Sequence, residues 1–457
     1  MRIAILAEVF LPKVDGVVNR TMNLIHQLVR SNDDVLVVCP QAEGSKACSV
    51  PVVEFPSFAF PLYPEYRIAQ PNKRLMKVLD HFTPDVLHYV NPFAFGFRCH
   101  DLLHRAGVRI PSVFSFHTLY GEFVKQYRLL KPLSHLLWWF MREYHNRADV
   151  NLTVSSIMRD ELTKRGFRRV ELWPPAVDSE LFHPERQNLE MRSRLSNGQA
   201  HRPLLLTVSR LAPEKNVGFL ADVLDRFPDA ALAVVGDGPQ RSELEQHFAG
   251  KNAHFVGYLK GAELAAAYAS ADAFVYASET ETMGNVVLEA MACGCPVVAP
   301  RAGGIPSLVA HGDTGMLYTP RILPDAVGAI RSILSDDDFR ARMSRAAREA
   351  VEVLNWDHSI ARVREVYQEA IRSYQPASAR VRFQQRLAQV VVSGLVFAFQ
   401  SVSSRGEANA GNRPVLPRFR RENDLAAHRS HGMNNGLVQD VKRLSGSLVA
   451  RNEPQSA

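Results

Sequence analysis

Short apolar runs alternate with longer amphipathic stretches along this chain, and the alternation occurs in two series. This pattern is typical of parallel β-sheets that are covered by helices on both faces. The apolar runs of the first series are 3–7, 35–38, 86–89, 112–116 and 150–154. Those of the second series are 204–208, 231–235, 273–276 and 296–299. The sequence therefore predicts an α/β protein with two Rossmann-like, doubly wound domains.

The predicted domain boundaries follow from where the two series stop. The first series occupies residues 1–186, and the second occupies residues 204–355. Residues 187–203 are polar and lack strand character, so we predict an interdomain linker there. Residues 356–375 have the spacing of a last amphipathic helix. Residues 376–457 are a basic stretch rich in Ser, Arg, Asn and Gly, which we expect to be a poorly ordered tail.

The amino-acid composition indicates in which cellular compartment the protein works and which kinds of ligand it can bind. The net charge of +7 favours anions, and because it is not organised into a recognisable nucleic-acid module, we expect no nucleic acid. The five cysteines form no framework, and the apolar run at the start is too short for a signal peptide. Both features favour the cytoplasm. No apolar run reaches about 18 residues, so we expect no membrane span.

Two glutamates eight positions apart, Glu281 and Glu289, lie on either side of a loop-to-helix junction. The spacing of residues 286–292 predicts a helix, so that Glu281 lies in the loop and Glu289 in the helix. Backbone N–H groups at the start of this helix, around Gly284 and Asn285, can bind a phosphate, and the glutamates can accept hydrogen bonds from hydroxyl groups. Taken alone, the same pattern also fits an acidic residue near a helix dipole and an ordinary surface glutamate.

Other candidate residues follow predicted strands, where open parallel sheets bind ligands. Asp15 can cap a helix that begins near Val17, and Gly16 permits close approach of the backbone. His117 follows the strand 112–116 and places a titratable group at the strand tip, although a structural histidine fits equally well.

Arg210 and Lys215 follow the first strand of the second series and can neutralise a diphosphate. A solvated pair with Glu214 is the alternative. The turn at 236–239 lacks the G-x-G-x-x-G fingerprint, which argues against a nicotinamide dehydrogenase. Cys293-Gly294-Cys295 has no second Cys/His pair, so we predict buried thiols there and no metal site.

In this order the motifs resemble those of a retaining glycosyltransferase of family 4, with the GT-B fold. The similar segments are 10–16, 117, 177–178, 182–184, 209–215, 236–239, 281–289 and 303–304. The resemblance extends from residue 1 to about residue 375, and it implies that the helix 356–375 returns to the N-terminal domain. It also implies that the N-terminal domain lies on the acceptor side and that the C-terminal domain binds a nucleotide-sugar.

The resemblance further implies roles for individual residues. The residues that would act on the reacting groups are His117, Glu281, Arg210 and Lys215. The residues that would hold the donor are Gly16, Arg210, Lys215, Tyr258, Glu281, Thr282, Met283, Gly284, Asn285 and Glu289. In this assignment Arg210 and Lys215 clamp the diphosphate, while Glu289 binds the ribose. The backbone near Tyr258 would meet the base.

Within the family, the segments 116–118, 170–173, 177–180 and 279–284 are most similar to enzymes that make sulfoquinovosyl diacylglycerol. The resemblance therefore implies transfer of sulfoquinovose from UDP-sulfoquinovose to diacylglycerol, without a tightly bound cofactor or a metal. None of these motifs assigns a cation to the sulfonate. A GDP-mannose-dependent lipid alpha-mannosyltransferase is the nearest alternative. A sugar-nucleotide epimerase of GT-B architecture and a nucleotide-sugar binder without turnover are further alternatives.

Residues 131–142 combine tryptophan and phenylalanine with flanking cations, which suits a helix at a membrane interface. A packed core helix has the same pattern, since aromatic residues at helical spacing are usually buried. We therefore expect a cytoplasmic protein that can associate peripherally with the inner face of the cell membrane, where a lipid acceptor would lie.

Overall fold

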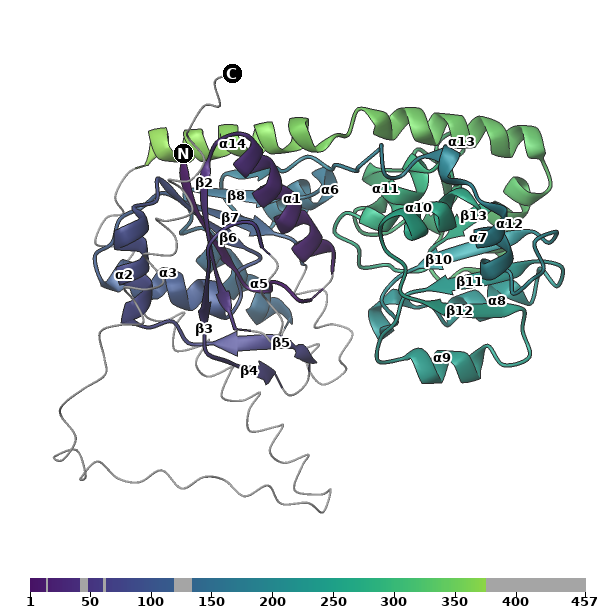
Figure 1. Cartoon of the computed structure of the whole chain (residues 1–457), viewed down its shortest axis with the longest axis horizontal. Helices are drawn as coiled ribbons and strands as arrows, with labels where there is room; N and C mark the ends of the chain where they lie inside the picture. Colours follow the sequence, from purple (N-terminus) through teal and green to yellow (C-terminus); the bar gives the residue numbers. More distant parts are fainter. Residues whose placement is uncertain (14, 42–47, 61–62, 119–133, 375–457) are drawn as a thin grey trace, which may run out of the picture. The chain divides into compact units, whose positions relative to one another are not determined.

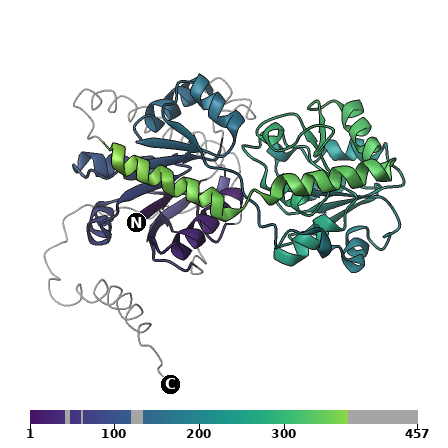
Figure 2. The same ribbon diagram turned by 90° about the horizontal axis from the view of Figure 1, so that it is seen from above.

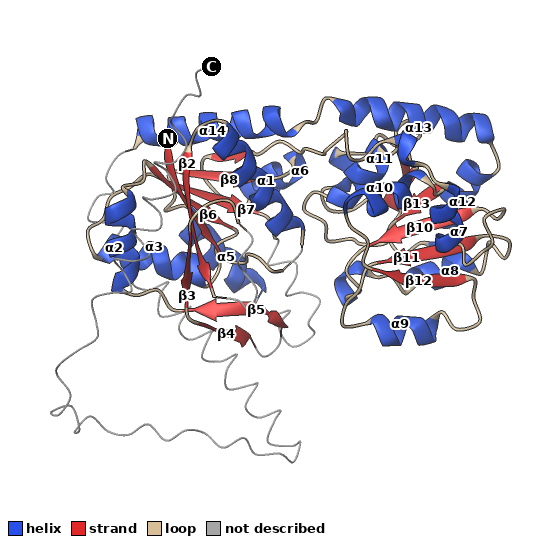
Figure 3. Ribbon diagram, viewed as in Figure 1, coloured by secondary structure: helices blue, strands red, loops and turns tan. Residues whose placement is uncertain are grey.

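The computed structural model describes residues 1–457 except 14, 42–47, 61–62, 119–133 and 375–457. Its described part contains two parallel sheets, each flanked by helices on both faces (Figures 1 and 3). This arrangement confirms the predicted α/β fold with two Rossmann-like domains. The predicted tail lies outside the described residues.

The first sheet has the strand order β3-β2-β1-β6-β7-β8-β9, and every pair of neighbours is parallel. Its strands are β1 (Arg2–Ala7), β2 (Asp34–Pro40), β3 (Val52–Phe55), β6 (Val86–Val90), β7 (Ser112–Phe116), β8 (Val150–Thr153) and β9 (Val170–Leu172). A separate antiparallel hairpin consists of β4 (Ser57–Phe60) and β5 (Tyr63–Ala69). The helices connecting these strands are α1 (Gly16–Arg30), α2 (Lys73–Phe82), α3 (Phe95–Arg105), α5 (Ser134–His145) and α6 (Ser156–Lys164).

The second sheet has the order β12-β11-β10-β13-β14-β15 and is also parallel throughout. Its strands are β10 (Leu204–Val208), β11 (Ala231–Val235), β12 (Ala253–Gly257), β13 (Ala273–Val275), β14 (Val297–Pro300) and β15 (Gly315–Tyr318). Its helices are α7 (Leu189–Leu195), α8 (Phe219–Leu224), α9 (Arg241–His247), α10 (Gly261–Ala269), α11 (Asn285–Ala292), α12 (Leu323–Leu334) and α13 (Asp337–Glu352).

Helix α1 begins where the sequence predicts it. The Asp15 carboxylate accepts hydrogen bonds from the backbone N–H groups of Val17 and Val18, both at 2.9 Å. These two donors would otherwise lack partners in the first turn of the helix. The predicted cap is therefore confirmed, and it orients the helix directly after the tip of β1.

Helix α3 has no side-chain cap from its own N-cap residue, Ala94. Instead, the buried Glu8 carboxylate at the end of β1 accepts hydrogen bonds from four successive backbone N–H groups, those of residues 93–96, at 2.8–3.0 Å. The Tyr66 hydroxyl of β5 donates a fifth hydrogen bond to Glu8 at 2.6 Å. Because a buried carboxylate needs such donors, Glu8 ties the first strand to helix α3 and to the β4–β5 hairpin.

The last described helix, α14 (Trp356–Ser373), packs against the first sheet (Figure 2). Its buried residues include Val363, Val366 and Tyr367, which share a hydrophobic core with Ile3 and Ile5 of β1. The predicted final helix is confirmed, and its apolar face completes a core built mainly by the N-terminal half of the chain.

The segment predicted as a linker, 187–203, contains helix α7, which the Asn188 side chain caps. Met191 and Leu195 of this helix are buried in one core with Leu204 of β10. This part of the segment therefore packs with the second sheet. The domain boundaries themselves stay a prediction.

Helix α5 contains the aromatic residues that suggested a membrane interface. Trp138 and Phe140 are buried in the core of the first sheet, and Trp139 is partly buried against it, which fits the alternative of a packed core helix. Residues 131–133 lie outside the described part. None of the described helices combines the length and the hydrophobicity of a membrane-spanning segment.

Candidate functional site

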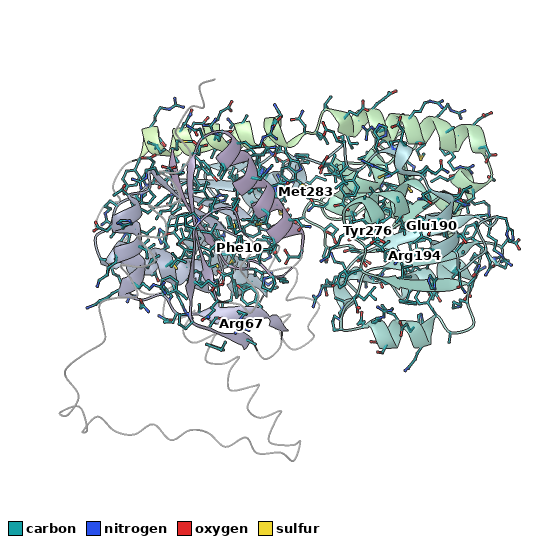
Figure 4. All side chains as sticks on the ribbon, in the orientation of Figure 1. Phe10, Arg67, Glu190, Arg194, Tyr276 and Met283 are labelled. Carbon is teal, nitrogen blue, oxygen red and sulfur yellow. The ribbon has the colours of Figure 1, made fainter. Side chains whose placement is uncertain are left out.

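The loop between β13 and α11, residues 278–284, is called the acidic loop below. Its Glu281 Oε1 atom accepts hydrogen bonds from the Tyr276 hydroxyl at 2.8 Å and from the Ser278 hydroxyl at 2.9 Å. The Lys215 ammonium lies 2.5 Å from the same oxygen. Figure 4 labels Tyr276, which precedes the acidic loop, and Met283, which belongs to it. The structure thus brings together two residues, Lys215 and Glu281, that are 66 positions apart.

This pairing determines the charges in the acidic loop. Burial by itself would raise the pKa of Glu281, but the Lys215 ammonium and the hydroxyl groups of Tyr276 and Ser278 hold that pKa below its ordinary value. Burial opposes the charge of Lys215 as well, yet the Glu281 carboxylate raises the pKa of the ammonium. Both groups are therefore ionised at neutral pH, and the lysine keeps about a fifth of its side chain exposed (21%).

Gly303 and Gly304 pack closely against the backbone of the acidic loop. The N–H of Gly304 donates to the Glu281 carbonyl at 2.7 Å. A Cβ atom on Gly303 would lie 2.3 Å from that same carbonyl oxygen, and one on Gly304 would lie 2.2 Å from the Thr282 oxygen. Any side chain at either position would push the loop away. The glycine turn therefore packs against the backbone of the acidic loop.

Helix α11 starts with Gly284 as its N-cap, at a φ of 97° that strongly favours glycine. No side chain caps this end of the helix. Its first N–H groups are thus available to an anion beside the acidic loop. As predicted, Glu281 lies in the loop and Glu289 lies within the helix.

Arg210 follows β10, and its Nη1 atom lies 3.7 Å from the Glu214 carboxylate. Lys215 ends the 3₁₀-helix Pro213–Lys215 that comes next. The turn after β11 packs closely here, since a Cβ atom on Gly236 would lie 1.9 Å from the Ser209 carbonyl oxygen. Two cations therefore stand at the carboxyl end of the second sheet.

His117 lies at the carboxyl end of β7 and is only 6% exposed. Its Nε2 atom lies 2.9 Å from the Ser115 hydroxyl, and the Asn91 side chain accepts the His117 backbone N–H at 3.1 Å. Burial, followed by the positive charge of Arg20, lowers the pKa of His117 well below its ordinary value. The imidazole is therefore neutral at pH 7.

Two hydrogen bonds connect predicted site residues that are far apart in the sequence. The Thr282 hydroxyl donates to the His117 carbonyl at 2.7 Å. The Asn285 side-chain amide lies 3.5 Å from the Gly16 carbonyl. A Cβ atom on Gly16 would lie 3.1 Å from this amide, so glycine permits the approach.

Glu289 and Tyr258 form hydrogen bonds with residues outside the acidic loop. Glu289 accepts a hydrogen bond from the Tyr268 hydroxyl at 3.0 Å, and burial raises the pKa of its carboxyl to about 7. Tyr258 is 59% exposed, with its hydroxyl 3.4 Å from the Asp237 carbonyl. Their predicted contacts with a ribose and a base stay predictions.

Sequence reasoning missed three residues of this region: Tyr276, Ser278 and Arg20. The hydroxyl groups of Tyr276 and Ser278 resemble those of any strand end and carry no pattern. Arg20, however, lies on the apolar stripe of α1 together with Thr21, Leu24 and Leu28, and an arginine within such a stripe is a readable signal.

Among the described residues, no group of three His, Cys, Asp or Glu side chains is arranged to hold a metal ion. Cys293 and Cys295 are free and buried, as predicted. Burial raises the pKa of the Cys293 thiol to about 12, so this thiol is protonated at neutral pH.

Comparison with known proteins gives two adjoining family matches. Residues 14–181 match the family model described as Glycosyltransferase Family 4. Residues 193–350 match the model described as Glycosyl transferases group 1. The second match contains the acidic loop and both cations, while the first contains His117 and Gly16.

Among curated proteins, a sulfoquinovosyl transferase of Arabidopsis thaliana is 37% identical over 371 residues, which cover 78% of this chain and 71% of the plant protein. A GDP-mannose-dependent alpha-mannosyltransferase of Mycolicibacterium smegmatis is 37% identical over 363 residues, covering 78% of this chain and 94% of the relative. An alpha-monoglucosyldiacylglycerol synthase of Acholeplasma laidlawii is 25% identical and covers 70% of this chain and 85% of the relative.

Among solved structures, the HepE protein of Anabaena in complex with UDP and glucose superposes with a TM-score of 0.65 at 22% identity, covering 80% of this chain and 99% of that chain. A sucrose-phosphate synthase of Thermosynechococcus elongatus superposes with a TM-score of 0.67 at 21% identity, covering 82% and 100%. At these identities the likeness establishes the fold.

Proposed function

Because this chain belongs to glycosyltransferase family 4 and has the GT-B fold, we propose that it transfers a sugar, with retention of configuration, from a nucleotide-diphosphate donor to a lipid acceptor. The observation that carries the proposal is the Lys215–Glu281 pair beside the uncapped start of α11. It offers a cation and free N–H groups to phosphate, with a carboxylate for sugar hydroxyl groups.

In this proposal the leaving diphosphate is stabilised by positive charge. Arg210 and Lys215 would contact its oxygens, and the first N–H groups of α11 would add their partial positive charge. These groups are held in place by Glu214 and Glu281, so little reorganisation is needed when charge develops. In this proposal these groups neutralise the diphosphate without a metal ion.

His117 and the acidic loop would position the sugar. The imidazole is neutral and can exchange hydrogen bonds with a hydroxyl group without adding charge. Glu281 already accepts three hydrogen bonds at one oxygen, so we assign this carboxylate to holding the sugar and not to attacking it.

As the donor and acceptor we propose UDP-sulfoquinovose and diacylglycerol. The support is the 37% identity with the sulfoquinovosyl transferase, together with the similarity of the acidic loop to that subgroup. The second candidate is a GDP-mannose-dependent lipid mannosyltransferase, which the mycobacterial relative at 37% identity favours. Association with the membrane surface belongs to the same proposal, since either acceptor would lie there.

The test offers UDP-sulfoquinovose, GDP-mannose and UDP-glucose separately to the purified full chain with vesicles that contain diacylglycerol. Products are identified by mass spectrometry. We expect UDP-sulfoquinovose to give glycolipid with a much higher kcat/KM than UDP-glucose or GDP-mannose. Product from GDP-mannose alone would replace the donor assignment with the second candidate. Donor consumption or isomerisation without glycolipid would overturn the lipid acceptor. Vesicle flotation of the same samples reports membrane association independently.

A further inference from the structure

Arg20 is a buried arginine on the inner face of α1. Its residue exposure is 2%. Its Nη2 atom donates to the carbonyl oxygens of Trp173 and Pro174 at 3.0 and 2.6 Å, and its guanidinium lies 4.4 Å from the centre of the Trp173 ring. The recorded partners within the described residues include no carboxylate. A full positive charge is thus buried against neutral groups.

Such burial is costly. Removing a cation from water costs several kcal/mol even after relaxation, unless an opposite charge compensates it. The burial lowers the pKa of Arg20 to about 9, so the guanidinium still carries its proton at neutral pH. Within the described residues this charge has no counter-ion, and an anionic ligand would supply one.

Unused hydrogen-bond donors lie in the same place. The Arg20 Nε atom and the Trp173 Nε1 atom are both buried, and neither has an acceptor in the described part of the chain. The Nε2 atom of His88 is likewise buried without a partner there, and the His88 ring lies 5.8 Å from the Trp173 ring. Buried polar atoms usually have partners, so several unpaired ones together indicate a place that would attract acceptor oxygens.

This cluster adjoins the proposed sugar position. The His117 ring packs edge-on against Trp173, at 5.3 Å between ring centres. The Arg20 Nη1 atom lies 3.2 Å from the Met283 sulfur, and Met283 belongs to the acidic loop. A thioether is a weak acceptor on a flexible side chain, so a stronger anionic acceptor can displace it.

We infer that Arg20 and Trp173 form the site that recognises an anionic, sulfonate-bearing substituent on the donor sugar. The inference rests on the proposed function and deepens it, because it names the groups that distinguish a sulfonated sugar from a neutral one. A sulfonate carries one negative charge and three acceptor oxygens. It matches the buried charge and the unused donors, whereas the hydroxyl group of a neutral hexose supplies no charge.

The test compares UDP-sulfoquinovose with UDP-glucose, which carries a hydroxyl group in place of the sulfonate. The measured quantity is the ratio of kcat/KM for the two donors. Arg20→Gln keeps a donor for the carbonyl oxygens but removes the charge, and we expect it to lower this ratio by about 10- to 150-fold, the range for a hydrogen bond to a charged group. Arg20→Lys should retain more of the ratio than Arg20→Gln. Trp173→Phe removes one N–H donor and should lower the ratio as well.

The matched control is Arg30→Gln, because Arg30 is an exposed arginine of the same helix and should leave the ratio unchanged. A purely structural role for Arg20 would lower kcat/KM for both donors together, and an unchanged ratio would therefore overturn the inference while leaving the proposed function intact.

A separate binding measurement distinguishes failure of the donor assignment from failure of the anion site formed by Arg20 and Trp173. Methanesulfonate should raise the melting temperature of the wild-type chain and should do so less for Arg20→Gln. If the wild type makes no product from UDP-sulfoquinovose but shows this Arg20-dependent stabilisation, the donor assignment fails and the anion site stands. If methanesulfonate stabilises both proteins equally, the anion site is refuted.

Discussion

Replacing Lys215 by methionine removes the ammonium group and keeps most of the aliphatic length. The Glu281 carboxylate would then retain only the hydroxyl donors of Tyr276 and Ser278. If Lys215 stabilises the leaving diphosphate, the loss of one such cation costs about 3 kcal/mol of transition-state stabilisation, or about 100-fold in kcat/KM. We expect a loss of this size with every donor that the wild type uses.

The same substitution should lower stability, because it leaves a carboxylate without its counter-ion. Breaking a fully buried pair costs about 3–5 kcal/mol, but Lys215 and Glu281 keep 21% and 16% of their side chains exposed. We therefore expect about 2 kcal/mol, or a decrease in the melting temperature of roughly 4–8 °C for a domain of this size.

The pH dependence identifies the cause of this stability loss. In the wild type the pKa of Glu281 is held below its ordinary value of 4.5, so the pair stabilises the fold above that pH and the stabilisation is lost as the pH falls. The difference in melting temperature between wild type and variant should thus be largest near pH 7 and should shrink below about pH 4.5.

Activity is measured by the mass-spectrometric transfer assay, and stability by thermal unfolding across pH. Lys251→Met is the matched control, since Lys251 is about as exposed as Lys215 but pairs with the much more exposed Asp225 (53%) in the same half of the chain. It should change neither quantity appreciably. If Lys215→Met keeps full kcat/KM with a normal melting temperature, both the diphosphate clamp and the electrostatic argument are refuted.

Two further substitutions test other carboxylates. Glu289→Gln should weaken nucleotide-sugar binding more than acceptor binding in isothermal titration, and equal losses would exclude the ribose role. Burial raises the pKa of the wild-type Glu289 carboxyl to about 7, so nucleotide affinity should fall as the pH drops through 7. The stability of the free enzyme should instead fall as the pH rises from 4.5 to 7, because the folded state binds the proton more tightly than the unfolded state. Glu289→Gln should flatten both pH dependences. Glu8→Gln turns an amide N–H₂ toward backbone donors at the start of α3 and should cost about 2–4 kcal/mol in urea unfolding. A cost below that of an average surface substitution would show that α3 does not depend on Glu8.

Local signals made part of the site predictable. Asp15 caps α1 within three residues of its own position, and the glutamates on either side of Gly284 follow a strand-to-helix pattern that neighbouring residues define. The long series of apolar runs likewise predicted both sheets. Strands β3, β9, β12 and β15 were not among the predicted runs. Strands β3, β9 and β12 are only partly buried along most or all of their length, and β9 has only three residues.

Contacts over long sequence distances could not be predicted in this way. Nothing near Lys215 indicates that its ammonium meets Glu281, because the contact depends on how β10 and β13 align. The burial of Arg20 depends on Trp173 and Trp356, which only the folded chain brings to α1. Helix α7 has seven residues, which is too few for a helical period to appear against a polar background.

The position of α14 has a consequence for how the protein is made. The first sheet is complete once β9 has been synthesised, yet Val363, Val366 and Tyr367 supply one wall of its core. A nascent chain that leaves the ribosome from the N-terminus therefore exposes this apolar surface until the whole second sheet, α12 and α13 have been translated. The two halves cannot mature strictly one after the other, because the first core closes only once α14 has been synthesised.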